Sequence, residues 1–189
     1  MGDVSFFNGE GDAKTYTKFA EFLNYYTSAR ETVVSISQKN LSSSSGIADF
    51  CCGTAEITRR IVDKKGGVKK VILIDKTADF IKEAKKLRMR AEVIPVEEDV
   101  LDAVIPAGSC DMVISTFAYH HLPDSLKPQF VKQAKGCLKA GGVVVLAEIF
   151  IKDASRFYSK KLQHRQGMTC VRERLGAYFQ GMALRKRDD

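Results

Sequence analysis

The sequence lacks the features that would place the chain in a membrane or send it through one. No apolar run approaches the roughly 20 residues that a membrane-spanning helix needs. Residues 1–6 carry neither the basic nor the apolar region of a secretory signal. They also miss the myristoylation pattern, because Phe6 stands where Ser or Thr is required. We therefore expect a soluble cytoplasmic protein without a membrane partner.

Cysteine patterns typical of metal centres and disulfide frameworks are also absent. The chain has an odd number of cysteines, and no Cys-x-x-Cys or Cys/His ligand spacing occurs among them. They are Cys51, Cys52, Cys110, Cys137 and Cys170. We expect no metal, and we interpret these residues as reduced thiols that pack as small hydrophobic side chains.

Composition favours one ordinary globular domain. The 189 residues are 44% hydrophobic and 28% charged, which is enough apolar material for one substantial core. The net charge is +7, and the basic residues gather at 64–70, 82–90 and 185–187. Such charge suits an anionic partner such as RNA, but solvated helix faces and loop ends are the favoured interpretation.

Residues 46–150 predict an α/β core. Short apolar runs alternate with helical patterns, which indicates a Rossmann-like, doubly wound, mainly parallel sheet with helices on both faces. The expected strands are 47–51, 71–74, 91–96, 112–117 and 143–149. The expected helices are 56–64, 78–87 and 125–138.

The two ends of the chain read as helical additions to this core, within one compact domain. Residues 1–45 form an N-terminal extension, in which a helix over 12–39 begins at Asp12 and either covers the site as a lid or packs on the sheet. Residues 151–189 form a C-terminal segment with helices expected over 155–165 and 169–184. No strand is expected after residue 150, so the prediction lacks a C-terminal strand hairpin.

Two features of the expected core are typical of nucleotide binding. The first strand runs through Asp-Phe-Cys-Cys-Gly-Thr-Ala into a helix, whose N-terminal N–H groups face a bound ligand. Asp75 ends the second strand, 22 positions after Gly53, where an acid grips ribose hydroxyls. Capping of the following helix is an equally good interpretation of Asp75.

The order of these motifs resembles the class-I S-adenosylmethionine-dependent methyltransferase superfamily, in its small methyltransferase-domain form. Residues 49–55 align without gaps with the Asp-Leu-Gly-Cys-Gly-Thr-Gly of that family. Asp75 and Asp99 match its acids after the second and third strands. Residues 117–124 are similar to its Phe-Ala-Leu-His-His-Leu-Pro-Asp, and residues 138–145 to its Leu-Lys-Pro-Gly-Gly strand entry.

The resemblance implies an S-adenosylmethionine site across the carboxyl ends of the first strands. The methionine end would contact 49–53, the ribose Asp75, the adenine Asp99 and the Val100 backbone, and the methyl group would point toward 117–121. The cofactor-binding residues so implied are Asp49, Cys51, Cys52, Gly53, Thr54, Asp75, Lys76, Asp99, Val100 and Phe117.

Cys51 and Ala55 depart from the family, which has glycine at both positions. A side chain at Cys51 would lie beside the cofactor and would strain the turn if the backbone there needs a positive φ. Together with the expected lack of a hairpin, this leaves a non-catalytic cofactor-binding or scaffold protein of the same fold as the runner-up. An NAD-binding oxidoreductase is a third reading.

His120 and His121 are the candidate catalytic residues, because histidine transfers protons near neutral pH. The alternative is that one packs and the other lines the pocket without transferring a proton. Methyl transfer does not always need a base, since alignment supplies much of the rate. The expected function is thus methyl transfer to an unidentified small molecule, RNA or protein.

Overall fold

The computed structural model describes residues 24–42, 44–149, 168–174 and 179–186. The described strands form one seven-stranded sheet in the order β3-β2-β1-β4-β5-β7-β6. Strands β1 to β5 pair in parallel, and their chain order reverses direction between β1 and β4. The predicted Rossmann-like fold is therefore confirmed. This reversal matters for function, because open α/β sheets bind ligands beyond the carboxyl ends of the strands at such a point.

The predicted core elements are found with small changes at their ends. Each expected strand and helix between 46 and 149 has a counterpart, because the apolar runs are long enough to set their own periodicity. The strands are β1 (Gly46–Phe50), β2 (Lys70–Asp75), β3 (Glu92–Glu97), β4 (Cys110–Thr116) and β5 (Leu138–Ile149). The helices are α3 (Glu56–Lys65), α4 (Ala78–Ala84), α5 (Lys127–Cys137) and the short 3-10 helix η1 (Tyr119–His121).

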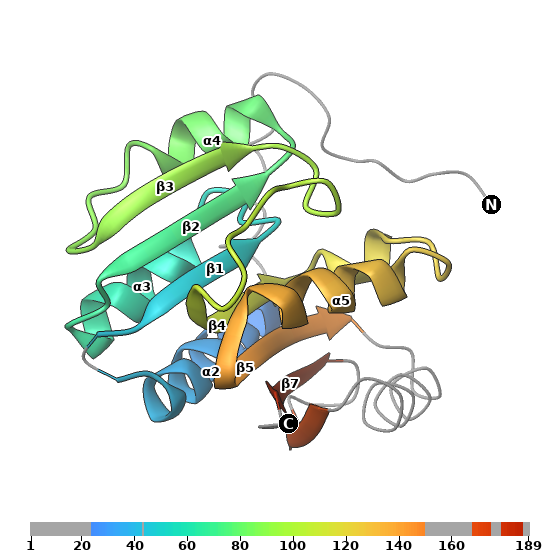
Figure 1. The fold of residues 1–189 in the computed structure, drawn as a ribbon. Helices are drawn as coiled ribbons and strands as arrows, with labels where there is room; N and C mark the ends of the chain where they lie inside the picture. The colour runs from blue at the N-terminus through green and yellow to red at the C-terminus, as the bar shows by residue number, and fades with distance from the viewer. Residues whose placement is uncertain (1–23, 43, 150–167, 175–178, 187–189) are drawn as a thin grey trace.

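Helices cover both faces of the sheet. Successive side chains of a strand point to opposite faces, and both sets of apolar side chains must be buried. In β1, Ala48 and Phe50 point to the face covered by α5, where Phe50 meets Phe130 edge-on at 5.4 Å between ring centroids. Ile47 points to the opposite face, where Val33 of α2 (Asn24–Asn40) and Ile61 of α3 pack. Figure 1 shows α5 in front of the sheet and α3 and α4 behind it.

The N-terminal helix is confirmed over Asn24–Asn40, while Asp12 and residues 12–23 lie outside the described residues. Val33, Val34 and Ile36 bury that helix against the sheet, so packing is a property of its described part. No helix in the described ranges is both long and apolar enough to cross a membrane. The boundaries at 45/46 and 150/151 stay predictions.

The expectation of a C-terminal segment without strands is wrong. Strands β6 (Met168–Arg174) and β7 (Phe179–Lys186) form an antiparallel hairpin in place of the helix expected over 169–184. Strand β7 pairs along β5 from Val143↔Arg185 to Ile149↔Phe179. Without β7, β5 would expose a row of unpaired backbone groups, and satisfying them overrides the local helix preference. The helix expected over 155–165 lies outside the described residues.

Candidate functional site

In the turn between β1 and α3, every second residue has a positive φ angle. Cys51, Gly53 and Ala55 have φ values of 56°, 54° and 56°, all in the left-handed region. Left-handed backbone favours glycine, and costs roughly 1–2 kcal/mol for another residue. The turn is closed by hydrogen bonds from the N–H of Cys52 to the carbonyl of Ile74 and from the N–H of Ala55 to the carbonyl of Cys52, both 2.9 Å. The glycine-type conformation is therefore kept although two side chains strain it.

Asp75 at the end of β2 holds this turn in place. Its Oδ2 accepts a hydrogen bond from the N–H of Gly53, and its Oδ1 accepts one from the N–H of Thr77, each at 2.9 Å. Burial raises the pKa of this carboxyl group, and the two N–H donors oppose that rise. The Thr77 side chain also hydrogen-bonds the carboxyl group, and the two oxygens together still have acceptor capacity for a ligand. Capping near α4 and ligand binding are thus compatible roles, not alternatives.

Asp49 lies at the base of the turn with an unpaired oxygen. Its side chain is 2% exposed, and its Oδ2 accepts a hydrogen bond from the Thr58 hydroxyl at 2.5 Å. Its Oδ1 is buried, and no group within the described residues donates a hydrogen bond to it. Burial raises the pKa of Asp49 to about 7, against the lowering effect of Thr58. A buried acceptor without a donor is costly unless a ligand supplies one.

The remaining predicted cofactor residues lie at the ends of the neighbouring strands. Asp99 follows β3, and its Oδ1 accepts a hydrogen bond from the N–H of Leu101 at 3.0 Å. Val100 beside it is buried, whereas Lys76, after β2, is exposed. Cys52 and Thr54 are half-buried within the first turn. The arrowheads of β1, β2, β3 and β5, which mark the carboxyl ends of these strands, all point to this end of the sheet (Figure 1).

Backbone hydrogen bonds join the neighbouring strand ends of this site, from the N–H of Cys52 to the carbonyl of Ile74 and from the N–H of Glu98 to the carbonyl of Asp75. Burial raises the pKa of Cys51, and the charges of four acidic residues raise it further. These residues are Asp75, Asp49, Asp99 and Glu148. They come from the ends of different strands, and those that are ionised favour a cationic ligand in the site.

The turn after β4 has the same kind of strained backbone as the turn after β1. Phe117 has φ 55°, is 6% exposed, and donates its N–H to the carbonyl of Ala147 at 2.8 Å. The rings of His120 and His121 follow it, with centroids 4.0 Å apart. A non-glycine residue held in this conformation stores strain, which is typical of functional sites.

Glu148 organises this second turn and was missed by the sequence analysis. Its Oε1 accepts hydrogen bonds from the N–H groups of Ala118 and Tyr119, at 3.0 and 2.8 Å. Its Oε2 lies 2.6 Å from Nδ1 of His120. The available signal was that it is the one charged residue in the apolar run 143–149.

Other motif residues serve the fold at the opposite edge of the sheet. One carboxylate oxygen of Asp111 accepts hydrogen bonds from the N–H of Gly46 at 2.7 Å and from Nζ of Lys139 at 2.8 Å. A Cβ at Gly142 would lie 2.9 Å from the carbonyl oxygen of Lys139, so no larger residue fits there without a shift. These contacts join β4 to the first residues of β1 and β5.

Comparison with known proteins agrees with this geometry. The family model described as "Methyltransferase domain" matches residues 47–142, and the chain belongs to that family. This confirms the resemblance to class-I S-adenosylmethionine-dependent methyltransferases and does not favour the non-catalytic alternative.

Curated relatives and solved structures are similar to this chain over different shares of its length. An uncharacterized methyltransferase of Schizosaccharomyces pombe is 36% identical over 108 residues, which cover 57% of this chain and 38% of the relative. One from Bacillus cereus is 29% identical over 167 residues, covering 80% and 71% of the two chains. The DhpI–SAH complex superimposes with a TM-score of 0.79 at 17% identity, over 99% and 96% of the chains. The chain spans half or less of the length of several curated relatives.

Proposed function

We propose that the chain binds S-adenosylmethionine at the carboxyl edge of β1, β2 and β3 and transfers its methyl group to an acceptor held near the turn after β4. The main observation is the buried Oδ1 of Asp49, which lies in a site rich in acidic residues and accepts no hydrogen bond from the part of the chain that the structure describes. The ammonium group of the cofactor would supply the missing donor, and its sulfonium would meet a favourable potential. The DhpI–SAH complex, which shares the fold, supports this choice of ligand.

In this proposal the residues bind the cofactor through the roles predicted for them. Asp49, Cys51, Cys52, Gly53 and Thr54 would surround the methionine end. Asp75 and Lys76 would hold the ribose, and Asp99 and Val100 the adenine. Phe117 and the histidines would face the methyl group. When bound, the cofactor supplies an electrophilic methyl group, and the chain contributes by aligning the acceptor with it and by excluding water.

Two observations answer the grounds for a non-catalytic protein. The turn keeps a left-handed backbone at Cys51 and Ala55, where the family has glycine. The two side chains therefore add strain to the turn but do not change its backbone conformation. The C-terminal hairpin is present. Both features support a complete methyltransferase fold.

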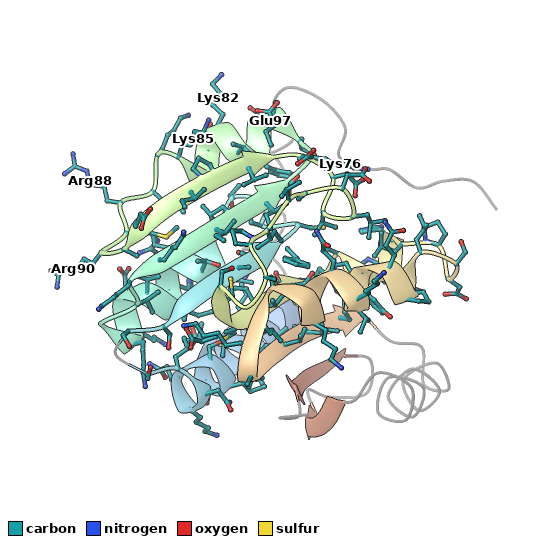
Figure 2. The ribbon with its side chains drawn as sticks, in the orientation of Figure 1. Lys76, Lys82, Lys85, Arg88, Arg90 and Glu97 are labelled. Atoms are coloured by element: carbon teal, nitrogen blue, oxygen red, sulfur yellow. The ribbon has the colours of Figure 1, made fainter. Side chains whose placement is uncertain are left out.

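The acceptor is not defined by the basic surface. Lys82, Lys85, Arg88 and Arg90 are exposed on α4 and the segment after it, and they point away from the sheet (Figure 2). Arg88 and Arg90 lie at the end of the sheet opposite the arrowheads (Figures 1 and 2). This placement gives no support to an anionic acceptor in the site, although nucleic acid stays open as a partner. Cytoplasmic location stays a prediction.

Calorimetric titration of the full chain with S-adenosylhomocysteine, with NAD as the matched control, tests the proposal. We expect saturable binding of the first ligand and none of the second, with a rise in melting temperature, because a ligand of the native state must stabilise it. No heat and no thermal shift at millimolar S-adenosylhomocysteine would contradict the proposal. Binding without release of S-adenosylhomocysteine from S-adenosylmethionine across an acceptor library would favour the non-catalytic alternative.

A further inference from the structure

Glu148 is a buried acid with a complete set of partners. Its side chain is 0% exposed, while that of His120 is 28% exposed. Burying a carboxylate is costly unless hydrogen bonds compensate it. Here two backbone N–H groups serve Oε1 and the imidazole serves Oε2. The three contacts come from three successive residues of one turn, so a single side chain of β5 sets the course of the turn after β4.

The contact with His120 also decides where the imidazole carries its proton. An ionised carboxylate accepts hydrogen bonds and has none to donate, so the hydrogen between Oε2 and Nδ1 belongs to the histidine. A neutral imidazole protonated at Nδ1 holds its lone pair on Nε2. The imidazole is partly exposed. Its neighbour Tyr119 belongs to the hydrophobic cluster against which Cys51 packs, so the turn after β4 lies beside the turn after β1.

We propose that Glu148 is the positioning residue of His120, which holds the imidazole with its lone pair on Nε2, ready to take a proton from an O–H or N–H acceptor. This inference rests on the proposed function. The acceptor proton would pass to Nε2, the acceptor lone pair would bond to the methyl carbon, and the carbon–sulfur pair would leave with sulfur. The resulting imidazolium would be stabilised by the carboxylate of Glu148. The acceptor class is therefore one with a proton to lose.

Nitrogen NMR of the chain labelled with ¹⁵N-histidine reads this arrangement directly. Protonated and unprotonated ring nitrogens have well-separated shifts, so the tautomer of each of His120, His121 and His164 can be measured with and without S-adenosylhomocysteine. We expect neutral His120 to be protonated at Nδ1. A spectrum in which neutral His120 is protonated at Nε2 would overturn the proposal, whatever any variant does.

Glu148→Gln is the decisive variant because its geometry is forced. The two backbone N–H groups of Ala118 and Tyr119 need an oxygen, so the glutamine carbonyl must face them. Its NH₂ group then faces Nδ1 of His120 as a donor and drives the proton to Nε2. We expect the tautomer of His120 to invert in Glu148→Gln and to stay as in wild type in the matched control His121→Gln. An unchanged tautomer in Glu148→Gln would contradict the proposal.

Binding of S-adenosylhomocysteine separates this inference from the proposed function. If wild type binds the ligand but His120 carries its proton on Nε2, the positioning role fails and the proposed function stands. If His120 has the expected tautomer but no ligand binds, the proposed function fails. The Glu148–His120 pair then belongs to the fold alone, and its assignment to methyl transfer is overturned.

Discussion

The turn after β1 and the turn after β4 are each held by a carboxylate from the next strand along the sheet, but the two carboxylates differ in what remains for a ligand. Asp75 is 8% exposed and accepts from two backbone N–H groups and from the Thr77 side chain, and its remaining acceptor capacity can serve a ligand. Glu148 is fully buried, and its Oε2 hydrogen-bonds the His120 imidazole. A carboxylate that anchors a turn therefore leaves acceptor atoms for a ligand in the first turn, and holds an imidazole in position in the second.

Both turns also carry non-glycine residues with positive φ, at Cys51 and Ala55 in the first and at Phe117 in the second. Such strain persists only where the surroundings impose the conformation. Here the imposing groups are Asp75 and Glu148, which fix the backbone N–H groups of each turn. In both turns of this protein, a backbone with positive φ therefore occurs together with a carboxylate that anchors it.

The largest expected effect comes from removing the two anchors. Glu148→Ala leaves two backbone N–H groups and a partly exposed imidazole without their acceptor, and should lower the free energy of unfolding by about 2–6 kcal/mol, at about 1–3 kcal/mol for each unsatisfied N–H group. Asp75→Ala should cost about 1–3 kcal/mol, because water can reach the groups it leaves. Urea denaturation of both variants measures the difference. Equal losses would mean that the two carboxylates are not distinguished by burial.

Asp49 should make the unliganded protein less stable as the pH rises from about 4 to 7. Its pKa is about 7 in the fold, above the usual value of 3.8. A raised folded pKa contributes stability that is fully present below about pH 4 and is lost as pH rises toward 7, up to roughly 4 kcal/mol at 1.36 kcal/mol per pKa unit. Denaturation of wild type and Asp49→Asn between pH 4 and 8 should show the larger loss in wild type, because Asp75 keeps its own raised pKa in both proteins.

Ligand binding should respond to pH in the opposite direction. An ammonium group pairs with ionised Asp49, so S-adenosylhomocysteine should bind wild type more tightly at pH 8 than at pH 5.5, while Asp49→Asn should bind weakly and with little pH dependence. Calorimetry at the two pH values checks it. Tighter binding by wild type at the lower pH would exclude Asp49 as the partner of the ammonium group.

Asp75→Ala should weaken S-adenosylmethionine binding by about 1.5–3 kcal/mol, the range for hydrogen bonds to a charged group. Asp63→Ala is the matched control, because it removes the same charge from α3, where Asp63 pairs with Arg59. An unaltered dissociation constant for Asp75→Ala would leave that residue with its structural role alone.

The smallest effect concerns the two strained positions of the first turn. Cys51→Gly relieves a φ of 56°, and we expect it to tighten S-adenosylmethionine binding by on the order of 1 kcal/mol. Ala55→Gly relieves the same strain at a buried position with less side chain to lose. Titration of both variants beside wild type measures it. Weaker binding by Cys51→Gly alone would show that the thiol, which packs against the core, is an accommodated part of the site.

Local signals were enough to predict the first turn. Asp49, Gly53 and Asp75 lie close along the chain, and the spacing of a strand, a tight turn and a helix is set by backbone geometry. The positive φ at Cys51 could be expected only conditionally, from the glycine of related sequences, because a cysteine carries no signal for it. The second turn was predicted through its histidines, but its anchor was not, since Glu148 lies 28 residues from His120 along the chain.

The sequence by itself determined the α/β class, the five parallel strands and the acids at their ends, because each depends on periodicity or spacing within about 25 residues. Tertiary structure alone decided that 168–174 and 179–186 are strands, since the edge of β5 needs a partner more than those residues favour a helix. It also decided that Glu148 lies under the turn after β4. Pairing between distant strands brings such groups together, and no local pattern encodes which of them will meet.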